Sequence, residues 1–562
     1  MAYSSASSAF WRCQISTNLT SNPSAKKWNL AQDHSSIASK FTCSIRRGDA
    51  QHQAIIATPL QDKIKEARHV LMSKIVEDPF QSLVMIDTIQ RLGIAHHFQE
   101  EVKTLLQKQY VGGHCLNRHD LHEVALTFRL LRQQGYHVPA DVFNKFMDKN
   151  GHLEQKLSQE LKGLIGLYEA AQLSIPGEDI LDQAANLCNS LLMSGLNLNE
   201  SEARVVETTL KYPYHRSLSR FMPQNFISGS QGEEEWIHVV QDLAILDYKM
   251  VQPIYHKEMR QISLWWKDLG LAKELKFARN QPLKWYMWST AVLADPRFTE
   301  QRVDLTKPIS FIYIIDDIFD VYGTLDELTL FTEAVTRWDT SKVDHLPDYM
   351  KTCFKALYDI TNEIGCKFCV EHGWNPIETL KKTWVSLCNA FLVEAKWFNS
   401  KHLPEAEEYL RNGIISSGVH VVLVHLFFLL GGEGISNENI DVIKGDTMPG
   451  IIYFTAKILR LYDDLGSAKD ENQDGHDGSY VEYYMKEHQG CSVESAREYT
   501  LHMISDAWKC LNKECLSPNP FSTSFINASL NVARMVPLMY TYDDNHNLPS
   551  LKEHMKSFLY KT

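Results

Sequence analysis

The sequence lacks several features that would place it in other classes of protein. Its longest apolar run, Val421–Leu430 with His425 inside it, is too short to span a bilayer, so we expect a buried helix there. No basic face stands out in a chain of net charge −12, which argues against nucleic acid as a partner. No second pair of cysteines completes a zinc set with Cys366 and Cys369, which we interpret as ordinary buried thiols in a helix.

The chain also lacks the signs of β-structure. Alternating patterns bounded by Asn-Gly or Asp-Gly turns do not occur, and no repeat of 20–50 residues is present. Apolar residues instead recur at helical spacing, for example in 121–136 and in 160–173. A polar stretch with two glycines, 228–236, is the candidate domain boundary. We therefore predict an all-α fold with a leader at 1–50, an N-terminal helical domain at 51–230 and a C-terminal helical domain at 231–562.

The first 32 residues contain no acidic residue, and the first one in the chain is Asp33. This part is rich in Ser and Thr, contains Arg12, Lys26 and Lys27, and has no apolar segment of the kind that secretory signals need. Such a composition is typical of an organelle transit peptide, and a disordered tail is the alternative. We accordingly predict a plastid location, with the cytosol as the alternative.

Carboxylates are concentrated in the stretch PISFIYIIDDIFDVYG, residues 308–323. Asp316, Asp317 and Asp320 follow an apolar segment directly, and charge beside a core segment is costly unless something cancels it. On a helix, Asp316 and Asp320 lie on the same face, where a divalent cation such as Mg²⁺ would bridge them. A solvated acidic end of a helix is the alternative.

The bounds of this helix follow from local signals. Pro308 suits the first turn of a helix, with Thr306 as a candidate cap, and Gly323 is suited to end it.

A second cluster of oxygen ligands follows the helical segment FTAKILRLY. Asp463, Ser467 and Glu471 are spaced four and four, which places them on one stripe of a helix. An EF-hand reading of the same region, from Asp470 onward, fails because its twelfth position is Val481 instead of Glu. Two oxygen clusters that each open from an apolar helix indicate a metal-bound diphosphate between them.

Because it contains both motifs, the chain resembles the plant class I terpene synthases from about residue 55 to the C-terminus. DDIFD matches the DDxxD motif of that family, and DDLGSAKDE matches its second metal motif. RLLRQQGYHVPADVF resembles the amino-terminal helical domain of the family. The resemblance implies a C-terminal class I helical bundle preceded by an α-barrel-like helical domain. It also implies a monomeric enzyme without a membrane span.

The resemblance further implies a set of site residues. Three Mg²⁺ ions, with Mn²⁺ as the alternative, would bind a prenyl diphosphate. The diphosphate would contact two arginines as well as the metal-binding aspartates. Trp288 and Tyr540 would line the pocket of the allylic cation, with core packing as the alternative. Gly418 would break a helix at the pocket. The implied metal ligands are Asp316, Asp320, Asp463, Ser467 and Glu471, and the implied diphosphate-binding residues are Arg279, Arg460, Asp316, Asp320 and Asp463.

Two departures from the family pattern narrow the function. The tandem-arginine motif RRx8W is incomplete, because Ile56 stands where Trp would follow Arg46 and Arg47. Gln281 replaces the second arginine of an R-x-R pair that begins at Arg279. Both features resemble the clade that makes acyclic tertiary alcohols, the linalool and nerolidol synthases. We therefore predict linalool from geranyl diphosphate and nerolidol from farnesyl diphosphate.

Other functions remain as alternatives. A cyclising mono- or sesquiterpene synthase would share every motif named above. A chain-elongating prenyltransferase usually carries two DDxxD motifs in a shorter chain, whereas this chain carries one. A non-catalytic helical scaffold would leave both oxygen clusters unexplained. No DxDD motif occurs, which argues against cyclisation that begins by protonation.

Overall fold

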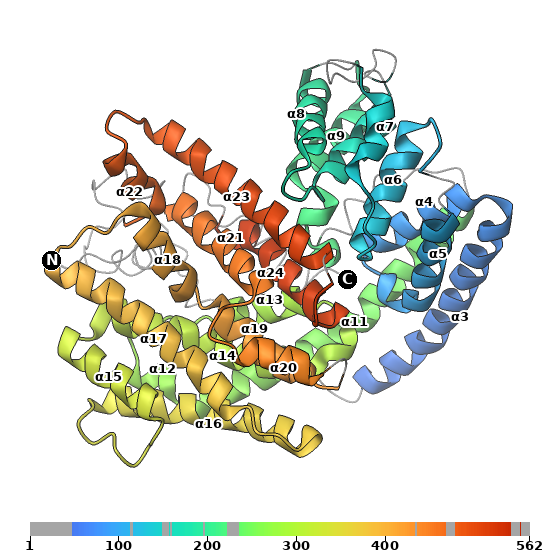
Figure 1. The fold of residues 1–562 in the computed structure, drawn as a ribbon. Coiled ribbons are helices and arrows are strands. Elements are labelled where there is room, and N and C mark those ends of the chain that lie inside the picture. Colours follow the sequence, from blue (N-terminus) through green and yellow to red (C-terminus); the bar gives the residue numbers. More distant parts are fainter. Residues whose placement is uncertain are drawn as a thin grey trace, which may run out of the picture. The chain divides into compact units, whose positions relative to one another are not determined.

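The structure is a computed structural model, and it confirms the predicted all-α fold (Figure 1). It describes residues 48–112, 116–148, 157, 160–194, 197–221, 235–432, 435–467, 478–516, 518–540 and 551. In these ranges the regular elements are helices, and no β-sheet is present. The side chains of residues 48–57, 74–77, 194 and 467 lie outside the description.

The chain divides into two compact units. The N-terminal unit contains residues 46–253 and 509–519, and the C-terminal unit contains 254–508 and 520–559. The chain passes from the first to the second inside one long helix, α11 (Glu235–Leu269), which has Pro253 within it. The predicted boundary between the two helical domains, at residues 230 and 231, stays a prediction.

The N-terminal unit is built from helices that bury one face each. Asp78 and Asp120 cap two of them, and their side chains accept hydrogen bonds from backbone N–H groups of the first turn. Gly135, with φ of 84°, lies two residues beyond the end of α6 at Gln133. The elements are α3 (Gly48–Glu77), α4 (Pro79–Arg91), η2 (Ala95–His97), α5 (Gln99–Gly112), α6 (Leu121–Gln133), η3 (Ala140–Phe146), α7 (Leu161–Ala171), α8 (Asp179–Ser194), α9 (Glu200–Lys211), η5 (Tyr214–Arg216) and η6 (Ser219–Phe221).

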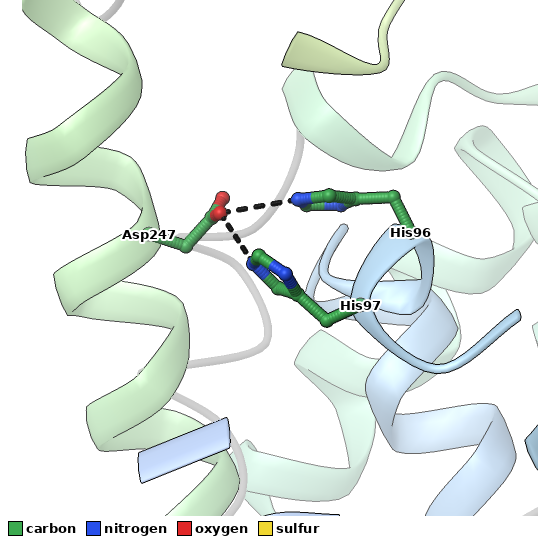
Figure 2. Close-up of side chains that lie close together, drawn as sticks. All are labelled: His96, His97 and Asp247. Carbon is green, nitrogen blue, oxygen red and sulfur yellow. Dashed lines mark hydrogen bonds and ion pairs between the residues drawn. The ribbon is translucent and has the colours of Figure 1, made fainter. Parts of the chain in front are cut away.

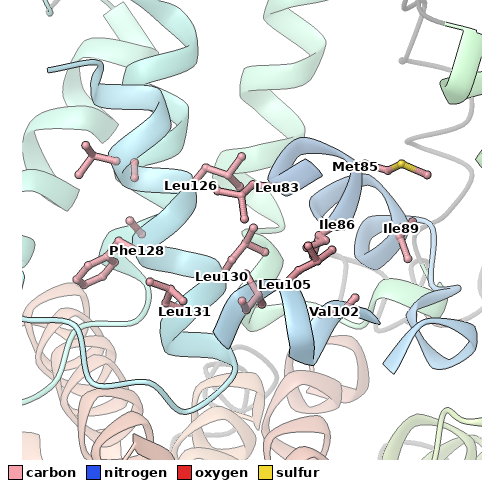
Figure 3. Close-up of a cluster of buried hydrophobic side chains, with 14 of the residues drawn as sticks. Leu83, Met85, Ile86, Ile89, Val102, Leu105, Leu126, Phe128, Leu130 and Leu131 are labelled. Atoms are coloured by element: carbon pink, nitrogen blue, oxygen red, sulfur yellow. The ribbon is translucent and has the colours of Figure 1, made fainter. Parts of the chain in front are cut away.

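The core of this unit lies where α4, α5 and α6 meet. Leu83 and Ile86 of α4 and Leu130 of α6 are fully buried, and Leu105 of α5 is almost so (Figure 3). Burial of each such side chain stabilises the fold by roughly 1.5–3 kcal/mol. The helical spacing of the apolar residues thus specifies this core.

Polar side chains join three segments of the same unit. The Nε2 atoms of His96 and His97 lie 3.2 and 2.8 Å from the same oxygen of Asp247 on α11 (Figure 2). Arg220 donates to the other oxygen of Asp247 at 2.8 Å and also lies 3.4 Å from Nδ1 of His96. Because an arginine occupies this position, we interpret the cluster as a hydrogen-bonded network and not as a metal site.

The C-terminal unit is a bundle in which α14 lies beside α13 and α19, and α21 lies beside α24. Its elements follow α11 in chain order. They are α12 (Leu271–Glu274), α13 (Pro282–Val292), η7 (Pro296–Phe298), α14 (Thr299–Asp317), η8 (Ile318–Tyr322), α15 (Leu325–Arg337), α16 (Asp348–His372), α17 (Ile377–Ser400), α18 (Ala406–Ser416), α19 (Val419–Leu430), α20 (Asn437–Lys444), α21 (Gly450–Ser467), α22 (Tyr480–Glu487), α23 (Val493–Leu516) and α24 (Thr523–Tyr540).

The helix that carries the first aspartate motif begins earlier than predicted. It starts at Thr299, so Pro308 lies inside it, and the Thr306 hydroxyl donates to the carbonyl of Arg302 instead of capping. The first part of α14 contains charged residues, so its sequence does not look like a buried helix. These residues are buried in ion pairs, such as that of Arg302 with Glu258. The predicted end is confirmed, because Gly323 follows the helical run.

The last turn of this run is unusual. Residues Ile318–Tyr322 form a π-helical turn, and the N–H of Gly323 donates to the carbonyl of Ile318 at 2.8 Å. A π turn widens the helix locally and is frequent at functional sites. Asp320 lies in this turn, one turn beyond Asp316, so the two carboxylates do not follow regular α-helical spacing.

The long apolar run forms a buried helix, as predicted. Of the described residues, 406–430 is a stretch apolar enough to cross a membrane, but 72% of its most apolar window is buried inside the protein. Gly418, with φ of 72°, breaks this stretch into α18 and α19. A Cβ atom at this position would lie 2.8 Å from the side chain of Ile312, so glycine is required on two counts.

The CxxC pair lies in a helix, α16, as predicted, but the prediction that its thiols are buried is wrong. Cys366 is exposed and Cys369 is half-buried, and both thiols are free. The two cysteines lie on the polar side of α16, whose buried face carries residues such as Phe368.

Candidate active site

A cavity of about 690 Å³, counting its open mouth, lies inside the C-terminal unit. Helices α13, α14, α17, α19, α21 and α24 supply most of its wall, together with the break between α18 and α19. Most of the lining is apolar, which suits a hydrocarbon ligand. The polar lining residues are Tyr313, Asp316, Ser416, Ser417, Asp463 and Tyr540.

The first aspartate of each metal motif lies in the wall of this cavity. Asp316 comes from α14 and Asp463 from α21, and both are buried. Burial raises the pKa of Asp316 to about 6, although Arg279 opposes the shift. Burial likewise raises the pKa of Asp463 to about 7, with Arg460 opposing. Two segments far apart in the sequence thus place carboxylates at one end of a single cavity.

Two further carboxylates lie close to this end. Burial raises the pKa of Asp320 well above its usual range, and the charges of Asp316 and Glu394 add to the shift. Glu394 is a buried residue of α17, and burial raises its pKa to about 7. The sequence reasoning missed Glu394, because a single acidic residue in the middle of a long helix carries no motif.

The first candidate diphosphate-binding arginine, Arg279, is buried among aspartates. Its guanidinium lies 2.5 Å from Asp316 and 2.8 Å from Asp317, and it also donates to the carbonyl of Tyr313 at 2.9 Å. The backbone N–H of Arg279 donates to Asp317 at 2.7 Å. Arg279 is thus fixed directly beside the first aspartate motif.

The second candidate, Arg460, is held in the same way beside the second motif. Its Nε donates to Asp464 at 2.9 Å, and its Nη2 donates to the Tyr409 hydroxyl at 2.7 Å. Asp463 lies 3.7 Å from the same guanidinium. Gly413 allows this arrangement, because a Cβ atom there would lie 2.6 Å from Cδ of Arg460.

The two motifs therefore share one design. In each pair of adjacent aspartates, the first residue lies in the cavity wall and the second pairs with an arginine. The sequence reasoning gave no role to the second residues, Asp317 and Asp464. Helical geometry could have indicated their different role, because neighbouring residues on a helix point about 100° apart and cannot both face the cavity.

The two aromatic candidates, Trp288 and Tyr540, both lie in the cavity wall. The indole of Trp288 faces the cavity and donates from Nε1 to the Tyr313 hydroxyl at 2.8 Å, and Tyr540 lies at the end of α24. Their neighbours Trp285 and Tyr286 are core residues: Trp285 packs against Trp266, and Tyr286 donates to Glu258. Tyr313 itself was missed, because it stands inside an apolar run.

The rest of the second metal motif lies outside the description. The backbone of Ser467 ends α21, but its side chain lies outside the description. Glu471 and the loop that follows lie outside the described residues.

One unexpected cation accompanies this end of the cavity. Lys284 lies one turn before Trp288 on α13. Burial lowers its pKa to about 7, Arg279 adds to the shift, and the charge of Asp463 opposes it. Lys284 follows Gln281 by three positions, and this closeness to the R-x-R position is the only indication in the sequence that it lies near the site.

The donor set fits divalent metal ions. Three aspartates and a glutamate are buried close together, and each has a pKa above its usual range. Burial without enough positive charge produces such shifts, and a hard cation with oxygen ligands relieves it.

Comparison with family models supports this interpretation. Residues 32–210 match the N-terminal domain of terpene synthases. Residues 267–510 match the metal-binding domain of the terpene synthase family. The second match contains both aspartate motifs, Arg279 and Arg460, whereas Tyr540 lies beyond it.

Curated plant proteins are similar over most of the chain. Probable terpene synthase 13 of Ricinus communis is 57% identical, covering 91% of this chain and 90% of the relative. The (E)-nerolidol synthase TPS18VF of Cannabis sativa is 52% identical, with 89% and 92% covered. The chloroplastic S-(+)-linalool synthase of Arabidopsis thaliana is 48% identical, with 88% and 87% covered.

A solved structure has the same fold. Isoprene synthase from grey poplar leaves, in complex with three Mg²⁺ ions and dimethylallyl-S-thiolodiphosphate, is 35% identical with a TM-score of 0.83. The match covers 91% of this chain and 98% of that one. A cavity with apolar walls and a carboxylate-rich end is thus found in a chain that belongs to the terpene synthase family, within the group of plant enzymes that includes linalool and nerolidol synthases.

Proposed function

We propose that this terpene synthase ionises geranyl diphosphate, and also farnesyl diphosphate, and captures the allylic cation with water. The products are linalool and nerolidol. The observation that carries the proposal is the cavity itself, in which an apolar wall adjoins one carboxylate-rich end. The nerolidol and linalool synthases named above support the product class.

The charged end binds the diphosphate in this proposal. Asp316, Asp320, Asp463, Ser467 and Glu471 would hold three Mg²⁺ ions, which supply Lewis-acid stabilisation of the leaving group. The structure adds Glu394 to the candidates at this end.

The arginines contribute fixed positive charge beside the metal ligands. Arg279 and Arg460 are already held in place by Asp317 and Asp464, so they need no reorganisation when charge develops on the diphosphate. They stabilise the departing anion as preorganised hydrogen-bond donors. Loss of the leaving group is favoured for this reason.

The apolar part of the cavity protects the cation. Trp288 and Tyr540 present aromatic faces, which stabilise a cation without reacting with it. Because the Trp288 indole is fixed by its hydrogen bond to Tyr313, this face is held rigidly in the wall. The carboxylates of the lining, Asp316 and Asp463, are the proposed metal ligands, so bound cations would keep them from trapping the carbocation.

The missing arginines favour an acyclic product. Cyclisation from geranyl diphosphate requires the diphosphate to return to C3 and to leave a second time. Gln281 in place of a second arginine, and the absence of RRx8W, both weaken the hold on the leaving group. Water therefore reaches the first cation before it can refold.

One alternative has support of its own. Tricyclene synthase Oc15 of Antirrhinum majus, named for a cyclic product, is 46% identical over 95% of this chain. A cyclising mono- or sesquiterpene synthase is therefore the second candidate. A chain-elongating prenyltransferase and a scaffold have no comparable support.

We also propose that the enzyme acts in plastids. The acid-poor leader supports this location, as does the chloroplastic name of the linalool synthase. A fusion of residues 1–50 to a fluorescent protein should enter plastids, and a diffuse cytosolic signal would contradict the proposal.

Product analysis tests the function directly. The protein is incubated with MgCl₂ and either geranyl or farnesyl diphosphate in water enriched in ¹⁸O, and the products are separated by gas chromatography and mass spectrometry. We expect linalool and nerolidol that carry the label. A dominant cyclic hydrocarbon would favour the alternative, and a labelled primary alcohol would show capture at C1 instead.

A further inference from the structure

Water capture requires a particular kind of hydrogen-bond partner. The attacking water must direct a lone pair at the cation, so the protein has to accept hydrogen bonds from its two protons. In the described part of the cavity wall, the carboxylates of Asp316 and Asp463 are acceptor groups at the proposed diphosphate end. The remaining polar groups are hydroxyls, each with one donor and two acceptor sites.

Ser416 has a hydroxyl whose proton is already committed. Its Oγ donates to Oε1 of Glu394 at 2.7 Å, and the side chain of Asn412 donates to the same oxygen at 3.1 Å. A carboxylate is a strong acceptor, so it fixes the direction of the serine proton. The Oγ atom of Ser416 is thus left as an acceptor at the cavity wall.

Two neighbouring hydroxyl oxygens already accept from other groups. Ser417 donates to the carbonyl of Ile414 at 2.7 Å and accepts from the N–H of Val419 at 3.4 Å. The Tyr313 oxygen accepts from the Trp288 indole at 2.8 Å. Ser416 has no corresponding donor among the described residues, so its oxygen is the better acceptor for a water molecule.

The position of Ser416 in the fold supports the same role. It is the last residue of α18, and the chain turns two residues later at Gly418. The residue is only 4% exposed, and the little surface that it has contributes to the cavity wall. Glu394 connects this wall to the carboxylate-rich end, because its charge also acts on Asp320.

We propose that Ser416 positions the water molecule that attacks the tertiary carbon of the allylic cation. The inference rests on the proposed function, which it deepens by naming the residue that favours an alcohol over a hydrocarbon.

The step is balanced without any further reagent. The diphosphate leaves C1 with the electron pair of the C–O bond. The water oxygen then forms a bond to C3, and the resulting oxonium loses one proton to the diphosphate. Prenyl diphosphate and water thus give a tertiary alcohol and hydrogen diphosphate. Without the positioned water, the cation instead loses a proton from carbon, which gives an acyclic olefin.

The ratio of tertiary alcohol to acyclic olefin tests the proposal. This ratio is measured on whatever turnover remains, so a loss of total activity does not obscure it. We expect Ser416→Ala to lower the ratio by about fivefold, the effect of losing one hydrogen bond. Ser416→Thr keeps the hydroxyl and should retain most of the wild-type ratio.

Ser416→Cys separates the role of the oxygen from the support that it gives to Glu394. Its thiol can still donate weakly to the carboxylate, but sulfur is a poor acceptor. We expect a ratio as low as that of Ser416→Ala. A wild-type ratio in the cysteine variant would show that only the contact with Glu394 matters, and it would overturn the proposal.

Ser310→Ala is the matched control. Ser310 is a buried helical serine of the same unit that donates to the carbonyl of Lys307 at 2.7 Å and does not line the cavity. Its substitution should leave the ratio unchanged. An unchanged ratio in Ser416→Ala, or a fall only in Tyr540→Phe or Ser417→Ala, would refute the role of Ser416.

Failure of the proposed function would look different. In that case the wild-type protein itself would give no labelled tertiary alcohol. A wild-type protein that makes the alcohol, together with an unaffected Ser416→Ala ratio, would contradict only the inference about Ser416.

Discussion

Buried carboxylates occur in both units of the molecule, but their surroundings differ in charge. In the N-terminal unit, burial alone would raise the pKa of Asp247, yet Arg220 and two histidines hold it well below its usual range. In the cavity of the C-terminal unit, burial raises the pKa values of Asp316 and Asp463 to about 6 and 7 despite the nearby arginines. The charge of Asp247 is thus fully compensated by its neighbours, and we call such a cluster complete. The charges of Asp316 and Asp463 are not fully compensated, and we call their cluster incomplete.

The difference separates a structural network from a binding site. Asp87 of the N-terminal unit shows the same completeness, because Arg129 and Arg91 lower its pKa against the effect of burial. Carboxylates near the cavity, among them Asp316, Asp320, Asp463 and Glu394, have raised pKa values instead, which makes this cluster costly to fold in its charged form. A protein keeps such a cluster when a ligand with positive charge completes it.

The largest effect on turnover is expected when one charge is removed from the incomplete cluster of cavity carboxylates. Asp316→Asn keeps the shape of the side chain but removes a proposed metal ligand at the cavity. We expect turnover of geranyl diphosphate to fall by at least about 100-fold, because metal ions supply several kcal/mol of transition-state stabilisation. Activity is measured by product formation in saturating MgCl₂.

The same variant should remain folded. Arg279 loses one partner but keeps Asp317, and removing a repelling buried charge relieves Asp320, whose pKa Asp316 raises. The thermal midpoint should therefore not fall by more than a few degrees. The control is circular dichroism at 222 nm. Near-normal turnover in Asp316→Asn would contradict the assignment of the metal site.

The second prediction concerns the complete cluster around Asp247, where a substitution should lower stability and not activity. Asp247→Asn leaves Arg220 buried without its charged partner. Breaking a buried ion pair costs about 3 kcal/mol, so the thermal midpoint should fall by roughly 6–10 °C. Turnover per folded molecule should stay close to the wild-type value. A stable but inactive Asp247→Asn protein would assign the network a role in catalysis.

Much of this arrangement could be predicted from the sequence. Helical spacing and the absence of strand patterns indicated the all-α fold, and two motifs with oxygen ligands at intervals of four indicated a diphosphate site. Asp316 and Asp463 do meet at one cavity, although they lie in different helices. Motifs are readable because their spacing reflects the helix, which is a local property.

The parts that could not be predicted depend on packing. The start of α14 was misplaced because Arg302 and its neighbours are charged, and only the fold shows that Glu258 neutralises this arginine. Glu394 reaches the site from α17 without any motif. Exposure of Cys366 likewise depends on which face of α16 is covered. Sequence patterns show which side chains share a face, and they do not show what that face contacts.

The last prediction concerns the pH dependence of stability, where the expected effect is smallest. Asp316 and Asp463 have folded pKa values of about 6 and 7, above the value near 4 expected in the unfolded chain. The folded metal-free protein therefore binds more protons than the unfolded chain between about pH 4 and pH 7. Through this window, these two groups make the metal-free protein less stable as the pH rises.

Metal ions should reverse that trend, because a bound cation replaces the protons. The thermal midpoint in MgCl₂ and inorganic diphosphate, minus the midpoint in EDTA and diphosphate, should therefore be larger at pH 7 than at pH 5.5, by a few degrees. Histidines elsewhere, such as His96, affect both midpoints equally and cancel in the difference. Asp463→Asn should flatten the dependence, because it removes the group with the higher pKa. A difference that is independent of pH in the wild-type protein would show that the cavity carboxylates are as fully compensated as Asp247.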